Sequence, residues 1–160
     1  MIRLIFIYAV LLGVFLVPNG LEWWGSQEVL AKMFTYHFFH GNVFHLLANC
    51  FALYFLIPRV KNWHIVIAFV IASLAVYVVS FNAIGFSNIV YAIIGLRSPS
   101  FKSYWWRHPG TLIFLGVTFL MLFLPNVSGL THVVSFAAGV LISVILRKLK
   151  EIHNVGARYI

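Results

Sequence analysis

The stretch Gly85-Phe86-Ser87-Asn88 is followed directly by the apolar run Ile89–Leu96. Ser87 therefore stands at the mouth of a hydrophobic segment, two residues after a glycine. A hydroxyl that is buried in hydrocarbon without a partner costs roughly 2–7 kcal/mol, and polar or ionisable groups inside membrane segments are candidates for function. We therefore expect the rest of the chain to hold a site around Ser87.

The composition is that of a protein embedded in a lipid bilayer. The chain has 160 residues, of which 62% are hydrophobic and 9% charged, and its mean hydropathy is +0.99. These values predict a polytopic, all-α membrane protein with a single domain over residues 1–160. The net charge of +8 comes from basic residues in the loops and the tail, which points to orientation in the membrane and not to nucleic acid.

Apolar runs predict six membrane-spanning segments, since a span needs about 20 apolar residues. The first run is read as a span and not as a cleaved signal peptide, because no small-x-small pattern follows it. The fourth and fifth runs are short for a full span. The six predicted segments are Ile2–Val17, Phe34–Ile57, His64–Ser80, Gly85–Leu96, Leu112–Leu124 and Gly129–Leu146.

The distribution of basic residues predicts the orientation of these segments. With the N-terminus inside, all of the 11 Lys and Arg residues except Lys32 fall on inner segments or the inner tail. Lys and Arg collect on the cytoplasmic side of membrane proteins. We therefore expect a multi-pass protein of the plasma or inner membrane, with both termini cytoplasmic.

In this topology the second, fourth and sixth segments all run inward from the outer face. They carry their polar side chains near the outer end, and we expect these side chains to meet in one site. Taken singly, each could instead be bonded to a nearby backbone carbonyl. The residues concerned are His40, His45, Asn49, Ser87 and His132.

Helical periodicity places small residues beside this predicted site. Small residues at helical spacing allow membrane helices to approach closely, and such an approach would bring His132 within reach of Ser87. A packing seam without chemistry would need the glycines but not the histidine. One face holds Ser87, Tyr91 and Gly95, and the other holds His132, Ser135, Gly139 and Ser143.

The residue inventory excludes several kinds of chemistry. The chain has no Asp, and its three Glu residues lie outside the predicted spans, which excludes an aspartyl protease and disfavours a proton-coupled transporter. No H-E-x-x-H motif occurs. A metal site at His37, His40 and His45 lacks a carboxylate or Cys ligand, and the last two would lie about 140° apart on a helix. We therefore expect no metal and no cofactor, which leaves a serine nucleophile and a histidine base.

Three motifs together resemble the rhomboid intramembrane serine proteases, in the order and the spans that the family uses. They are His45-x-x-x-Asn49, Gly85-x-Ser87 with Tyr91 and Gly95, and His132 followed by Gly139. The resemblance implies a six-helix bundle that cleaves transmembrane protein substrates near the outer face. It implies that Ser87 is the nucleophile and His132 the general base.

The resemblance also implies roles for the surrounding residues. His45 and Asn49 would help the Ser87 backbone N–H to stabilise the oxyanion, and Tyr91 would pack against the His132 ring. Gly85, Gly95, Gly139 and His40 would support the site. The fifth span and the loop Pro125–Leu130 would form the gate and cap through which a substrate helix enters.

The chain departs from the family pattern at two positions beside the site. Asn88 stands where the family usually has a second glycine, and Ser135 stands where the sixth span commonly has one. We expect Asn88 to be tolerated, because asparagine adopts positive φ more readily than most residues. The alternative is a catalytically inactive rhomboid-like protein that binds membrane helices. The sequence does not specify the oligomeric state.

Overall fold

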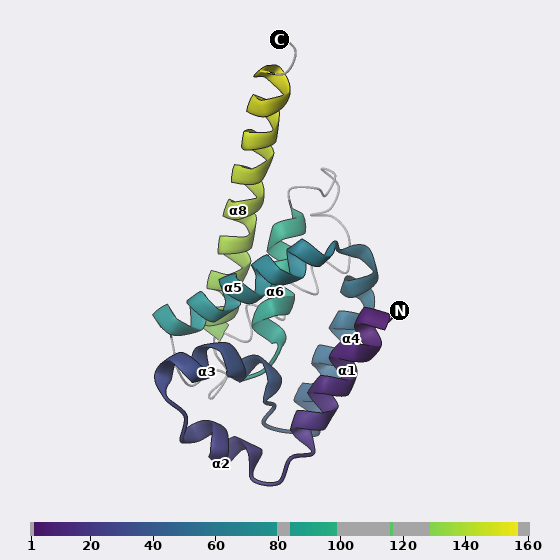
Figure 1. The fold of residues 1–160 in the computed structure, drawn as a ribbon, viewed down its shortest axis with the longest axis vertical. Helices are drawn as coiled ribbons and strands as arrows, with labels where there is room; N and C mark the ends of the chain where they lie inside the picture. Colours follow the sequence, from purple (N-terminus) through teal and green to yellow (C-terminus); the bar gives the residue numbers. More distant parts are fainter. Residues whose placement is uncertain (1, 80–83, 99–115, 117–128, 157–160) are drawn as a thin grey trace.

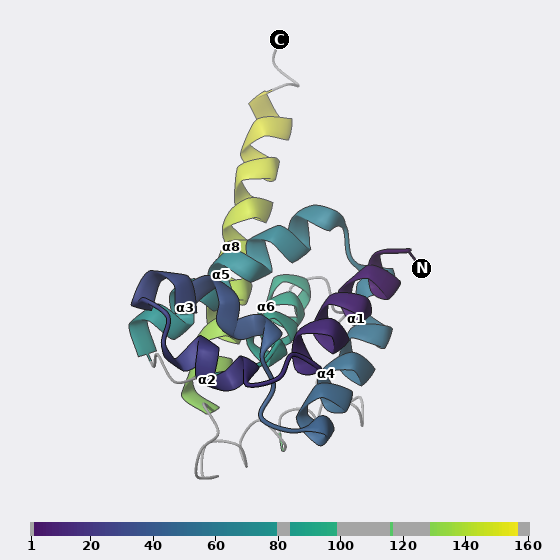
Figure 2. The same cartoon turned by 60° about the horizontal axis from the view of Figure 1, so that its bottom comes forward.

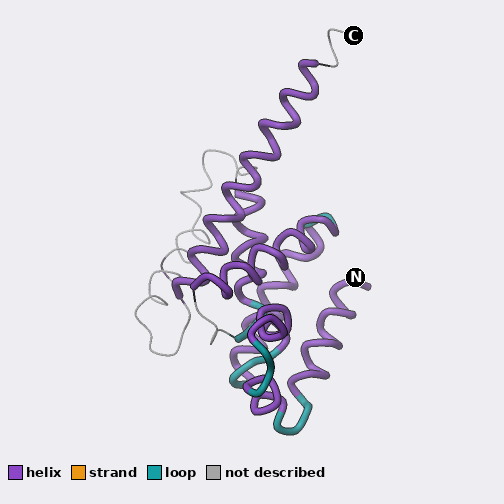
Figure 3. The backbone as a smooth tube through the Cα atoms, turned by 60° about the vertical axis from the view of Figure 1, so that its left-hand side comes forward, coloured by secondary structure: helices purple, strands orange, loops and turns teal. Residues whose placement is uncertain are grey.

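The computed structural model describes residues 2–79, 84–98, 116 and 129–156. All regular secondary structure in these ranges is helical (Figure 3). The elements are α1 (Ile2–Phe15), α2 (Gly20–Gly25), α3 (Val29–Thr35), η1 (Tyr36–Phe38), α4 (Val43–Leu56), η2 (Ile57–Arg59), α5 (Asn62–Val79), α6 (Ser87–Arg97) and α8 (Gly129–Gly156).

The predicted second span Phe34–Ile57 is wrong as a single helix. The chain bends by 74° between Val29–Phe38 and Val43–Leu56. Asn42 causes the new start: its backbone is extended, and its side chain accepts a hydrogen bond from the backbone N–H of His45 at 2.9 Å. Asparagine is among the best N-cap residues because it satisfies a backbone donor that would otherwise lack a partner. His40 therefore precedes α4, and the angle of about 140° that a continuous helix would set between His40 and His45 does not apply.

Helix α6 lies at the centre of the described structure. Between its polar first residues, Ser87 and Asn88, and its last residue, Arg97, it is apolar on all sides, as expected of a surrounded helix, and most of its residues are buried. It packs most extensively against α8 and also contacts α5, α4 and η1. Figures 1 and 2 show α6 enclosed by these elements, with α1 beside α4 at one edge.

Two glycines allow α6 and α8 to approach at backbone distance. A Cβ built on Gly139 would lie 2.5 Å from the carbonyl oxygen of Ala92, and one built on Gly95 would collide with the carbonyl of Phe136. Close backbone approach through small residues is the usual way in which membrane helices pack. Together with the Ser87–His132 contact, these contacts show that α6 and α8 run parallel.

Helix α8 is longer than the predicted span Gly129–Leu146. It continues through Arg147–Gly156, where no proline or internal glycine interrupts a series of good helix formers. Its last turns are exposed and project beyond the other helices (Figures 1 and 2).

Polar contacts join α1 to the two helices beside it. The Arg3 guanidinium donates to the carbonyl oxygen of Val60 at 3.0 Å and to Oδ1 of Asn62 at 2.7 Å. The Tyr8 hydroxyl donates to the carbonyl oxygen of Cys50 in α4. These bonds fix α1 against α4 and the start of α5.

Two of the described helices, α5 and α8, are long and apolar enough to cross a membrane, and the bent pair α3–α4 provides a third candidate. Helix α1 is apolar but has only 14 residues. The predicted fifth span Leu112–Leu124 lies outside the described residues, apart from position 116. The chain is therefore an all-helical membrane protein over its described part, and the count of six spans stays a prediction.

Candidate active site

A serine and a histidine meet where α6 and α8 begin. Ser87 is the first residue of α6, and His132 lies in the first turn of α8. Ser87 Oγ is 2.7 Å from Nε2 of His132. Because the helices run parallel and approach at Gly95 and Gly139, their first turns lie side by side, and this brings the two side chains together.

The ring of Tyr91 fixes the plane of the imidazole. Tyr91 lies one turn after Ser87 on α6, and its ring stacks on that of His132 with centroids 4.6 Å apart and planes 12° apart. Both side chains are buried. Such a stack restricts rotation of the histidine about χ2, so that Nε2 stays directed at the serine.

Gly85 brings α4 close to the serine. It has a φ of +111°, which side chains other than hydrogen rarely allow. A Cβ there would lie 2.5 Å from Nε2 of His45 and 3.5 Å from Nδ2 of Asn49. The predicted oxyanion residues thus flank the turn that leads into Ser87. Asn49 is buried, and its Nδ2 has no hydrogen-bond partner among the described residues.

The ring of His40 lies against that of His45. Their ring centroids are 5.0 Å apart, and Nδ1 of His40 is 3.3 Å from the carbonyl oxygen of Phe38. His37 points elsewhere, with Nε2 2.9 Å from Ser73 Oγ on α5. Over the described residues, no three His, Cys, Asp or Glu side chains are grouped as metal ligands.

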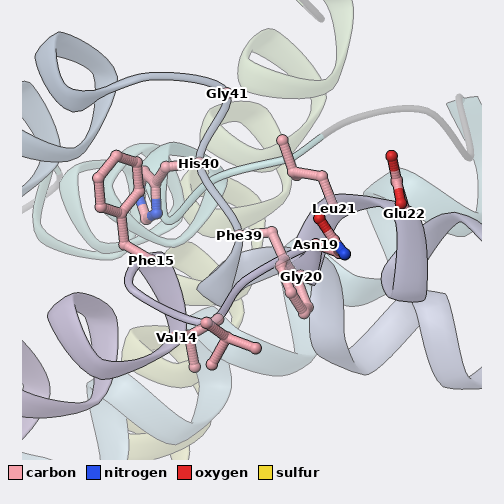
Figure 4. A pocket seen from close by; sticks show the side chains of 10 residues that line it. Val14, Phe15, Asn19, Gly20, Leu21, Glu22, Phe39, His40 and Gly41 are labelled. Atoms are coloured by element: carbon pink, nitrogen blue, oxygen red, sulfur yellow. The ribbon is translucent and has the colours of Figure 1, made fainter.

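A cavity of about 280 Å³ has His40 in its wall (Figure 4). It is bounded by the end of α1, the start of α2 and the segment before α4, and neither Ser87 nor His132 lines it. Its walls are Val14, Phe15, Val17, Asn19, Gly20, Leu21, Glu22, Phe39, His40 and Gly41.

The structure corrects the expectation for Asn88 and adds a residue that the sequence analysis missed. Asn88 lies inside α6 without positive φ, so backbone angle is not what the position demands. It is 1% exposed, and a side-chain hydrogen bond joins it to Tyr36. Tyr36 also accepts the N–H of Gly85 at its carbonyl oxygen, at 2.9 Å. No pattern in the sequence links Tyr36 to a serine 51 positions later.

Comparison with known proteins bears on the same stretch of chain. The family model of the rhomboid domain matches residues 20–149, which is more than half of the chain. No curated protein and no solved structure matches. The matched range includes Ser87, His132 and the close-packed glycines between their helices. The chain therefore belongs to the rhomboid family.

Proposed function

We propose that this protein is an intramembrane serine endopeptidase that uses a Ser87–His132 dyad on transmembrane protein substrates. The observation that carries the proposal is the 2.7 Å separation between Ser87 Oγ and His132 Nε2. A nucleophile and a base at hydrogen-bonding distance, with the base oriented by a third group, are the signature of nucleophilic catalysis. The Tyr91 stack supplies that orientation here.

The reaction begins when Ser87 Oγ attacks the carbonyl carbon of the scissile peptide and its proton passes to Nε2 of His132. The carbonyl π electrons move to the oxygen. The Ser87 backbone N–H and the side chains of His45 and Asn49 donate hydrogen bonds to this oxyanion. Uncharged donors act strongly where water is scarce and the dielectric constant is low.

His132 then gives its proton to the leaving amine, which departs and leaves an acyl ester on Ser87. A water molecule attacks the ester while His132 accepts a proton again, and the carboxylic acid leaves. Ser87 is only partly buried, which is compatible with the entry of water. No step requires a metal or a cofactor.

The proposed setting is a multi-pass protein with six spans and both termini in the cytoplasm. The site then lies in the outer part of the bilayer, since both helices of the dyad begin there. Substrates would be membrane helices, cut near their outer ends. This orientation rests on the distribution of basic residues.

The test is covalent labelling by a fluorophosphonate probe, which reacts with an activated serine. The purified wild-type protein should be labelled, and Ser87→Ala should not. A protein that only binds membrane helices would fail to react with the probe and would cleave none of the helices it retains. Equal labelling of wild type and Ser87→Ala would contradict the proposed mechanism.

A further inference from the structure

Tyr36 contacts the chain on both sides of Ser87. Its carbonyl oxygen accepts the N–H of Gly85, and its side chain shares a hydrogen bond with Asn88. Gly85 precedes the serine by two residues, and Asn88 follows it directly. The backbone that carries Ser87 is thus held at two points by one residue of η1.

The Tyr36 hydroxyl can form both of its bonds at once. A hydroxyl has one donor and two acceptor sites. Tyr36 donates to the carbonyl oxygen of Ala72 at 2.8 Å, which leaves its oxygen free to accept from the Asn88 amide. Oδ1 of Asn88 has no hydrogen-bond partner in the described part of the chain, so the amide engages Tyr36 through its NH₂ group.

These contacts are buried, and α5 supports them. Tyr36 is 0% and Asn88 1% exposed. Tyr36 is fixed to Ala72, and its neighbour His37 is fixed to the next α5 residue, Ser73. The His37–Ser73 bond holds η1 on α5, and among the described residues its only link to α6 is an edge contact between the His37 and Phe86 rings, with centroids 6.5 Å apart. It therefore provides a matched control for the Tyr36–Asn88 bond.

We propose that Tyr36 and Asn88 are positioning residues for the nucleophile: their side-chain hydrogen bond holds the first turn of α6 so that Ser87 Oγ faces His132. The inference rests on the proposed function. It assigns a purpose to the residue that departs from the family's usual glycine, because a glycine at position 88 has no side chain for Tyr36 to hold. The Asn88 side chain thus fixes by a hydrogen bond a position at which a glycine would leave the backbone without a side-chain contact.

The experiment compares Tyr36→Phe, Asn88→Ala, their double variant and Ser73→Ala, using the full chain in lipid nanodiscs. The readouts are the maximal rate of fluorophosphonate labelling and the Tm. Both single variants should lower the maximal rate by about tenfold. The double variant should be no slower than the slower single variant, because both changes remove the same bond. Ser73→Ala should lower the Tm by about as much as Tyr36→Phe and Asn88→Ala lower it, but it should leave the maximal labelling rate unchanged.

A second readout does not require activity. In a Cys50→Ala background, Ser87→Cys provides a single thiol. The rate of its alkylation by iodoacetamide reports the accessibility and surroundings of the side chain at position 87. Adding Asn88→Ala or Tyr36→Phe should change this rate severalfold, while adding Ser73→Ala should not.

An unlabelled wild type would overturn the proposed function, and the alkylation series would still decide the positioning role. Rates within twofold of wild type for Tyr36→Phe and Asn88→Ala, or an equal effect of Ser73→Ala, would overturn the inference.

Discussion

At the scale of single residues, Ser87 and His132 act on the same proton in the proposed mechanism, so the loss of either should remove the same step. We expect Ser87→Ala and His132→Ala each to abolish substrate cleavage. The double variant should be no worse than either single one, because residues that act as a unit are strongly non-additive. Cleavage of a model transmembrane substrate by purified variants measures this. A double variant that is slower than both singles by a further large factor would mean that the two residues act independently.

Asn49 is one of several proposed donors to the oxyanion, and this limits the effect of its loss. Removing one such donor typically costs about 10²–10³ in rate. We expect Asn49→Ala to fall at or below the lower end of that range, since His45 and the Ser87 N–H remain. The kcat of cleavage should fall while KM changes little. A change confined to KM would assign Asn49 to substrate binding instead.

Gly85 combines a positive φ with a close neighbour, so even a methyl group should disturb the site. The added Cβ of Gly85→Ala would meet the His45 ring at 2.5 Å and would strain the turn. We expect labelling by the fluorophosphonate probe to be lost. Gly41→Ala is the matched control: Gly41 does not have positive φ, and its built Cβ has only an ordinary contact, 3.6 Å from Ile84. Equal labelling of the two variants would contradict this account.

Spacing in the sequence predicted which residues would approach Ser87, but not which residues would hold it. His132 and Tyr91 follow from helical periodicity once the small-residue faces of the two helices are matched, and the structure sets His132 beside the serine and Tyr91 against His132. Tyr36 begins the short helix η1, which bonds to Ala72 of α5 and precedes the Asn42 cap. Such contacts have no period, so only the folded chain reveals them.

At the scale of elements, the contact between α6 and α8 should depend on Gly139. A Cβ at Gly139 would lie 2.5 Å from the Ala92 carbonyl, and overpacking of this kind costs about 1–3 kcal/mol. We expect Gly139→Ala to lower the Tm and to slow labelling as Ser87 and His132 separate. Gly13→Ala in α1 makes the same chemical change where none of the described residues lies within 4 Å. It should leave the labelling rate unchanged and should not lower the Tm, because alanine has a higher helix propensity than glycine. Equal Tm values for the two variants would show that α6 and α8 leave room for a methyl group at position 139.

The all-helical fold class follows from the composition and is confirmed over the described residues. The positions at which individual helices begin and end depend instead on local capping. Hydropathy gave one long second span because Phe34–Ile57 is apolar almost throughout. Asn42, one of several polar residues in this range, starts a new helix there, and the chain turns by 74°. Hydropathy cannot register this, because it averages over a window and a cap acts through one side chain.

At the scale of the whole molecule, the bias of basic residues makes the proposed orientation testable. In a Cys50→Ala background, we expect Glu22→Cys in α2 to react with an impermeant thiol reagent applied to intact cells. Lys150→Cys near the end of α8 should react only after the membrane is permeabilised. Both positions are exposed, so access and not burial decides the result. Reaction of Lys150→Cys from outside would place the C-terminus on the outer face and contradict the proposed topology.

The separation of Ser87 and His132 along the chain also affects the timing of biogenesis. The two residues are 45 positions apart, and a ribosome adds about 5–20 residues each second. For about 2 to 9 s the nascent chain therefore carries the proposed nucleophile, Ser87, without its proposed base, His132. A newly made serine of this kind cannot attack neighbouring helices while they are still being inserted. In the proposed mechanism, the order of α6 and α8 in translation thus keeps Ser87 inactive until the start of α8 has been synthesised.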